Sequence, residues 1–139
     1  MKKSHKLISW IAALVSAIIM LQTLYFKFSA APESVYIFST LGLEPYGRIG
    51  IGIAELIASI LILIPVTRFF GALFGLGIMI GAIFAHLTEL GIEVENDGGY
   101  LFILSLIVSI GCGICLYLYK EKLKTILKLI GIKKQANQD

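Results

Sequence analysis

The chain has 139 residues, of which 58% are hydrophobic and 15% are charged, and its formal net charge is +3. Its mean hydropathy of +0.89 is too high for a small soluble domain, in which the apolar share is nearer one half. The apolar residues form long blocks, and no segment alternates with a period of two. These features exclude a soluble domain and indicate membrane-spanning helices.

Four segments are apolar and long enough to cross a bilayer as helices, which takes roughly 18 residues or more. Only a few residues, including Pro65, separate the second segment from the third, so these two are expected to form an antiparallel hairpin. The sequence predicts an all-α, polytopic membrane protein with a four-transmembrane-helix bundle in one domain, residues 1–139. In chain order the spans cover about residues 7–26, 46–64, 67–90 and 99–119.

A secretory signal peptide is the alternative interpretation of the first segment, with Lys2, Lys3 and Lys6 as its charged region. Its apolar run is too long for a signal peptide. Pro32 would also directly follow the best small-residue cleavage site, Ala31. We therefore expect the first segment to remain as a transmembrane helix.

The long connection between the first two spans contains APESVYIFSTLGLEP. Pro32 and Glu33 are typical of a helix start, and Gly42 is typical of a helix stop. Three apolar residues between them share one helical face. We expect a short interfacial helix that lies on the outer surface and covers the mouth of the bundle.

The segment after the fourth span reads KEKLKTILKLIGIKK. Its leucines and isoleucines fall on one helical face, and its lysines lie elsewhere. A basic amphipathic helix beside a membrane usually lies in the interface and contacts anionic lipid headgroups. The sequence therefore predicts a basic amphipathic C-terminal helix at residues 120–134, with membrane lipids as its partner and protein docking as the alternative.

Basic residues are unevenly distributed between the two sides of the predicted bundle. Lys2, Lys3, Lys6, Arg68 and the six lysines from Lys120 onward fall on one side. Only two basic residues, in or next to the connection between the first two spans, fall on the other side. Short cytoplasmic loops carry an excess of Lys and Arg, so both termini are expected in the cytoplasm. The net positive charge then gives no support for nucleic-acid binding.

Polar residues from several spans fall at one level in the outer half. Glu55 lies about nine residues into the second span, or about 13 Å deep at 1.5 Å per residue, and His86 lies about 6 Å below the outer surface. Ionisable residues within spans are costly, and they usually face the bundle interior or a cavity. We expect one outer pocket, with Glu55 and His86 as candidates for proton handling. The predicted ligand-binding residues are Gln22, Lys27, Arg48, Glu55 and His86.

The same residues have alternative interpretations. Within the pocket, Glu55 would be stabilised by Arg48 or Lys27, or by His86 across the helix pair. Alternatively, Glu55 and Arg48 could form an intramembrane pair that only fixes helix register. His86 could only hydrogen-bond a neighbouring helix. Glu55, His86 and Glu89 could also bind a metal, because helical residues three apart, such as His86 and Glu89, can share an ion. Two carboxylates and one imidazole are an incomplete ligand set, so His86 and Glu89 are only weak candidates. We therefore expect no metal site.

Cys112 and Cys115 form a Cys-x-x-Cys sequence within GCGIC. In redox proteins such a motif makes a reactive thiol at a helix start. Here it lies deep in the fourth span with no cation expected nearby, so we interpret both cysteines as packing residues. Redox activity stays the alternative.

Small residues at four-residue steps predict close helix packing, because they let helix backbones approach in lipid. The second span supplies one such row, the third span two, and the fourth span one. The rows are Gly50–Ala54–Ala58, Gly71–Gly75, Gly77–Gly81 and Ser105–Ser109–Gly113.

Several longer stretches carry a resemblance to a known family. They are LYFKF, SAAPESVYIFSTLG, EPYGRIGIGIAELIASILILIP and GALFGLGIMIGAIFAHLTELGIEVENDGG, in that order, followed by the apolar fourth span. Together they cover about Leu21 to Tyr119, and they resemble the DoxX family of small four-helix membrane proteins. Glu55, Arg48, Lys27 and His86 match polar positions typical of that family.

The resemblance implies a multi-pass protein of the bacterial cytoplasmic (inner) membrane. Some members of the family are linked to quinone-dependent redox systems, so it implies a membrane subunit that depends on a membrane or peripheral redox partner protein. A quinone is the one cofactor it implies, and we expect no intrinsic cofactor and no complete enzyme in this chain. The alternative is a non-enzymatic scaffold whose buried polar groups only fix helix packing.

Overall fold

The structure is a computed structural model that describes the backbone of residues 1–136 and the side chains of residues 1–131. That part of the chain is helical and contains no strand, so the all-α prediction is confirmed. Four helices are long and apolar enough to cross a membrane, namely α1, α3, α5 and α4 together with η1. The helices are α1 (Lys3–Phe28), α2 (Pro32–Thr40), α3 (Tyr46–Leu63), α4 (Arg68–Ala85), the π-helix η1 (His86–Leu90) and α5 (Tyr100–Ala136).

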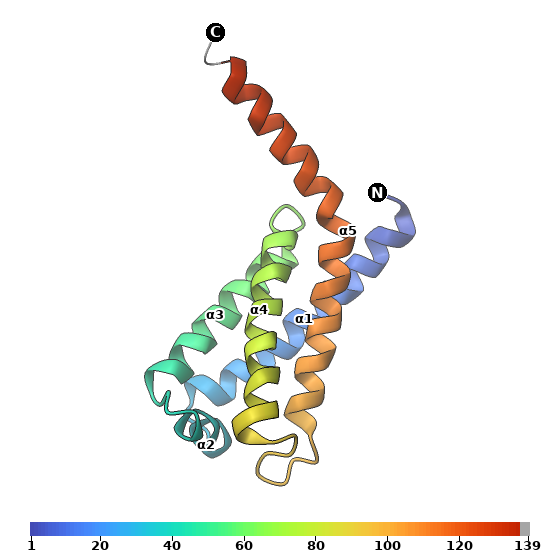
Figure 1. The fold of residues 1–139 in the computed structure, drawn as a ribbon. Coiled ribbons are helices and arrows are strands. Elements are labelled where there is room, and N and C mark those ends of the chain that lie inside the picture. The colour runs from blue at the N-terminus through green and yellow to red at the C-terminus, as the bar shows by residue number, and fades with distance from the viewer. Residues whose placement is uncertain (137–139) are drawn as a thin grey trace.

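The four long helices run side by side, and each packs against two neighbours (Figure 1). Helix α1 contacts α3 and α5, and α4 contacts the same two helices from the other side. One end of this ring carries α2 and the connection at residues 91–99, and we name it the loop end. The other end carries the α3–α4 turn and the N-terminal start of α1, and we name it the terminal end.

The α3–α4 turn forms the expected hairpin. Helix α3 ends at Leu63, Ile64 adopts an extended conformation, and α4 begins at Arg68. The Thr67 hydroxyl donates a hydrogen bond of 2.8 Å to the carbonyl oxygen of Leu61. This bond satisfies one of the last carbonyls of α3, which have no partner within the helix.

Helix α2 is the short helix that the connecting sequence predicts. Pro32 occupies its first turn, where a missing N–H costs nothing. Gly42 follows its end with a φ of +71°, a conformation that glycine adopts without strain. The helix packs against α1, α3 and η1 and therefore lies across the loop end.

Two helix backbones come into direct contact at Gly71. A Cβ atom added at Gly71 would overlap the backbone of Leu61 and Ile62, so α4 and α3 touch there. The packing prediction is wrong for other glycines, because a Cβ atom added to them would meet no atom within 4 Å. These open positions are Gly50, Gly77, Gly81 and Gly113.

The C-terminal segment is helical, as predicted, but it is not a separate element. Helix α5 continues through Tyr119, Lys120 and Glu121 without a break and projects past the terminal end (Figure 1). No glycine or proline interrupts this junction, and Lys and Glu favour helix. The segment carries exposed apolar side chains such as Ile126 and Leu127. The side chains of the expected segment after residue 131 lie outside the described part.

The core of the ring consists mainly of small and flexible side chains. Cys112 and Cys115 are free and completely buried within it. Cys115 lies with its Sγ 3.7 Å from the carbonyl oxygen of Ser9, which brings α5 close to α1. These positions agree with the interpretation of both cysteines as packing residues.

Candidate functional site

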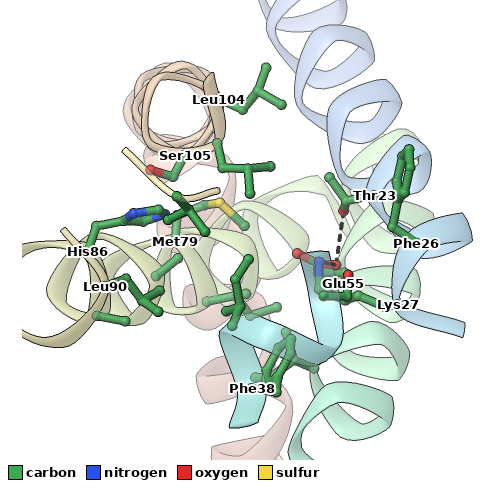
Figure 2. Close-up of a pocket in the computed structure, with 18 of the residues that line it drawn as sticks. Thr23, Phe26, Lys27, Phe38, Glu55, Met79, His86, Leu90, Leu104 and Ser105 are labelled. Atoms are coloured by element: carbon green, nitrogen blue, oxygen red, sulfur yellow. Dashed lines mark hydrogen bonds and ion pairs between the residues drawn. The ribbon is translucent and has the colours of Figure 1, made fainter. Parts of the chain in front are cut away.

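The loop end encloses a cavity of about 630 Å³. Helices α1, α2, α3, α4 and α5, the π-helix η1 and the 91–99 connection all contribute to its wall. Most of the wall is apolar, including Phe26, Phe38, Met79 and Leu104 (Figure 2). A volume of this size falls within the range of about 300–1,000 Å³ that is usual for small-molecule sites.

Glu55 lies on the wall of this cavity and is almost fully buried. The Lys27 Nζ atom lies 3.0 Å from Glu55 Oε2 and forms an ion pair with it. The Thr23 hydroxyl lies 3.2 Å from the same oxygen and 2.8 Å from the carbonyl oxygen of Met20. A hydroxyl has one proton, so Thr23 donates to one of these two acceptors at a time. The Glu55 carboxylate therefore has one firm partner, Lys27, and one exchangeable partner.

Thr23 was not predicted as a site residue. It precedes Lys27 by four positions, so the two side chains share one face of α1. Their shared face points at Glu55 on α3 (Figure 2). The four-residue spacing of Thr23 and Lys27 in the sequence QTLYFK could have indicated that Thr23 lies beside Lys27 at the site.

Arg48 is not part of this cluster. Its Nε atom donates a hydrogen bond of 2.8 Å to Glu44 Oε1, and its Nη1 donates to the carbonyl oxygen of Lys27. It does not line the cavity. The expectation that Arg48 shares the pocket and reaches Glu55 is therefore wrong. Glu44 lies one turn away, and the last carbonyls of α1 need donors, so Arg48 instead joins the end of α1 to the start of α3.

His86 lies on the opposite side of the cavity from Glu55 (Figure 2). Its Nδ1 atom is 2.8 Å from the carbonyl oxygen of Gly91, and its ring meets the ring of Phe102 edge-on at 5.6 Å. A carbonyl oxygen only accepts hydrogen bonds, so Nδ1 carries a proton and Nε2 is the acceptor of the neutral ring. No contact joins His86 to Glu55 among the described residues, so the predicted stabilisation of Glu55 by His86 is replaced by the pair with Lys27.

The remaining predicted residues lie at the edge of the site or outside it. Gln22 is exposed and lines the cavity. Glu89 is exposed and does not line it. Within the part of the chain that the structure describes, no three His, Cys, Asp or Glu side chains lie close enough to hold a metal ion. Neither His86 nor Glu89 therefore belongs to such a group.

The 91–99 connection closes over the cavity through Asp97. One carboxylate oxygen accepts hydrogen bonds from the backbone N–H groups of Val94 (3.0 Å) and Gly99 (2.8 Å). The other oxygen accepts one from Leu101 at 3.2 Å. Partial burial acts to raise the pKa of Asp97, but the three hydrogen bonds from backbone N–H groups outweigh it and hold the pKa below its usual value. The charged form of Asp97 therefore fixes the connection against the start of α5.

The terminal end holds a second polar cluster, which sequence analysis missed. Arg68 is completely buried and has no carboxylate partner among the described residues. Its guanidinium donates to the carbonyl oxygens of Ile62 (2.8 Å) and Leu63 (3.2 Å). It also donates to the hydroxyls of Tyr119 (3.0 Å) and Ser9 (3.4 Å). It also lies 4.1 Å from the centre of the Trp10 ring, which is a favourable cation–π geometry.

The terminal cluster therefore joins α1, α3, α4 and α5 through one side chain. Sequence analysis counted Arg68 only as one of the basic residues that set the orientation. The available signal was the position of Arg68 directly after the turn, where a cation can bond the last carbonyls of the preceding helix. Arg68 does not line the loop-end cavity.

One of three comparisons with known proteins finds a match. A family model described as the DoxX-like family matches residues 11–108. This range includes most of α1, all of α2, α3, α4 and η1, and the first residues of α5. It therefore contains all the residues that line the cavity, whereas Trp10 and Tyr119 of the terminal cluster lie outside it. Comparison with curated proteins and with solved structures gives no match.

Proposed function

Because this chain belongs to the DoxX-like family and is a multi-pass membrane protein, we propose that it binds a lipophilic ligand of the quinone class in the loop-end cavity. The observation that carries the proposal is the cavity itself. Its wall is mostly apolar, with the Lys27–Glu55 pair on one side and His86 on the other. Ligand sites typically combine such an apolar wall with a few polar groups that fix orientation.

The chemistry of a quinone suits this arrangement. A para-quinone is a flat, mostly apolar ring with carbonyl oxygens at two opposite edges. Lys27 and Thr23 offer donors at one side of the cavity, and a protonated His86 offers one at the other. The two sides of the cavity can therefore engage the two oxygens of one ring.

The proposed role is that of a membrane subunit in a redox system. Reduction of a quinone to a quinol takes up two electrons and two protons. The electrons would come from a membrane or peripheral redox partner protein. We assign proton exchange to Glu55 and His86, which are the buried ionisable residues of the cavity wall within the spans, because ionisable groups placed within spans commonly serve this purpose.

The distribution of charge supports an orientation with the terminal end in the cytoplasm. The described lysines outside the ring cluster near the N-terminus and along the end of α5, both at the terminal end. The two basic residues of the loop end, Lys27 and Arg48, are both paired with carboxylates. By the excess of basic residues in cytoplasmic segments, both termini face the cytoplasm of a bacterial inner membrane. The basic end of α5 is then placed to contact anionic lipid headgroups.

A scaffold without a ligand is the second candidate function. The observation that favours it is that the predicted site residues are bonded within the protein: Glu55 to Lys27, Arg48 to Glu44, and His86 to Gly91. A membrane protein can retain such pairs only to fix helix register. The two candidates differ in whether the cavity holds a ligand.

Mass spectrometry of molecules that copurify with the protein in mild detergent separates the two. The variants are Glu55→Gln, which removes the charge at the cavity wall, and Glu44→Gln, a carboxylate that pairs with Arg48 outside the cavity. We expect the wild type and Glu44→Gln to carry a quinone, and Glu55→Gln to lose at least about tenfold of it, which corresponds to about 1.4 kcal/mol of binding free energy. A wild type that carries only bulk phospholipid would support the scaffold instead.

A further inference from the structure

A second hollow lies on the outer surface of the ring, between α3 and α4. It has a volume of about 570 Å³ and is more open than the cavity. Only apolar residues line it, including Phe70, Leu73 and Phe74, and these three side chains are 41–53% exposed. Since α3 and α4 are predicted to face lipid on this side, we name the hollow the lipid-side groove.

The lipid-side groove and the cavity share part of their walls. Ile51, Gly77 and Ile78 line both of them. Gly77 is exposed, and a Cβ atom added there would meet no other atom within 4 Å. Gly77, which has no side chain, therefore lies at the point where the cavity inside the ring meets the groove on its outer surface.

We propose that a lateral passage joins the cavity to the lipid-side groove at Gly77. The ligand then has one polar ring, which stays in the cavity, and one long apolar tail, which leaves the cavity through this passage. This inference rests on the proposed function and names the class of its ligand, a quinone with a polyprenyl-type tail. The ring stays in the cavity near Lys27 and His86. The tail runs in the lipid-side groove and continues into the bilayer.

The chemistry of the groove selects an apolar chain as its occupant. No charged or hydrogen-bonding side chain lines it, and helix backbones have no spare bonding groups in lipid. A polar ligand or an extended peptide would leave its own polar groups without partners there, which is costly. An alkyl or prenyl chain has no polar groups that need hydrogen-bond partners.

The direction of the groove also fits a tail. It extends along α4 from Gly77 back to Phe70, which is about 10 Å at 1.5 Å per residue. It therefore runs along the helix, as the chains of surrounding lipids do. The tail exchanges one apolar environment for another, so the groove is expected to guide the tail and to add little affinity of its own.

The test blocks the passage and compares two probes. Gly77→Leu places a side chain at the shared wall, and Gly113→Leu is the matched control, because Gly113 also has open space around it but lines neither hollow. The probes are 2,3-dimethoxy-5-methyl-1,4-benzoquinone and the same ring with a decyl tail. Binding constants come from the rise in unfolding temperature of the purified full chain with increasing probe concentration.

We expect Gly77→Leu to raise the dissociation constant of the tailed probe at least about tenfold and to change that of the tail-less probe by less than about twofold. Gly113→Leu should bind both probes with the dissociation constants of the wild type. Equal effects of Gly77→Leu on both probes, or none on either, would overturn the passage while the cavity site stands. If the wild type binds neither probe, the proposed function fails, and the passage fails with it.

Discussion

The two ends of the ring use buried polar residues in opposite ways. At the terminal end, the Arg68 guanidinium is completely buried and bonded to two carbonyl oxygens and two hydroxyls. At the loop end, the Lys27–Glu55 pair and His86 lie on the wall of a cavity of about 630 Å³. The first arrangement closes the ring, and the second leaves space that a ligand can fill.

The difference shows that burial of an ionisable side chain does not by itself identify a binding site. Arg68 is more deeply buried than Glu55, with 0% of its surface exposed against 4%. What distinguishes Glu55 is the space beside it and a partner, Lys27, that is also part of the cavity wall. The following substitutions test this contrast, from the largest expected effect to the smallest.

Arg68→Met should have the largest effect. It removes the donor from the carbonyl oxygens of Ile62 and Leu63 and from the Tyr119 hydroxyl. A buried group that loses its partner costs about 1–3 kcal/mol, so we expect unfolding to become easier by about 3 kcal/mol or more. Unfolding monitored by circular dichroism in detergent measures this. A loss below about 1 kcal/mol would contradict the role of Arg68 in joining the four helices.

Two glycines of α4 should respond in opposite directions to alanine. Gly71→Ala places a methyl group against the backbone of Ile62 and should cost about 1–3 kcal/mol. Gly77→Ala meets open space and should stabilise the protein by about 0.4–1 kcal/mol, because alanine has less freedom in the unfolded chain. Thermal unfolding of the two variants side by side is the measurement. Similar effects at both positions would show that the ring is equally packed along its length.

The double variant Lys27→Met/Glu55→Met separates a structural pair from a functional one. Replacing both members of a buried ion pair by apolar residues is often neutral or stabilising, so we expect stability within about 1 kcal/mol of the wild type. Retention of the copurified ligand should nevertheless be lost. Unfolding and ligand content are both measured on the same preparation. A large loss of stability together with unchanged ligand content would favour the scaffold.

Asp97→Ala should have the smallest effect, and that effect should depend on pH. The folded protein holds the pKa of Asp97 below its unfolded value, which is about 3.9. The resulting stability is present above that value and disappears as pH falls through the lower, folded pKa. We therefore expect the wild type to be more stable than Asp97→Ala at pH 7, by under about 1 kcal/mol because Asp97 is largely solvated.

The pH titration of Asp97 is followed by hydrogen exchange of the backbone N–H groups of Val94, Gly99 and Leu101. Protection in the wild type should fall toward that of the variant as the pH drops below about 4. Protection that is the same in both proteins at pH 7 would show that Asp97 does not fix the 91–99 connection.

The helical architecture could be predicted from the sequence because its signals are local. Long apolar runs define the spans, Pro65 marks the hairpin, and Pro32 and Gly42 delimit α2. The continuation of α5 past Tyr119 was not predicted, since a change from apolar to basic residues marks a membrane boundary but does not end a helix.

The partners of the polar residues could be predicted only in part, because they depend on packing between helices. Lys27 was one of the expected partners of Glu55, and the structure joins the two. Arg48 lies two turns from Glu55 on one helix face, but Glu44 is closer to it. Arg68 depends on acceptors from three other helices, and no spacing within one segment reveals such a set.

The most direct test of the account is one experiment on two variants, Glu55→Gln and Arg68→Lys, with unfolding and copurified ligand measured on each. We expect Glu55→Gln to lose the quinone while its unfolding midpoint stays near that of the wild type. We expect Arg68→Lys, which keeps the charge but has fewer donors, to lower the midpoint and to retain the quinone per folded molecule. A quinone content that is unchanged in Glu55→Gln would contradict the claim that the loop end is the binding site.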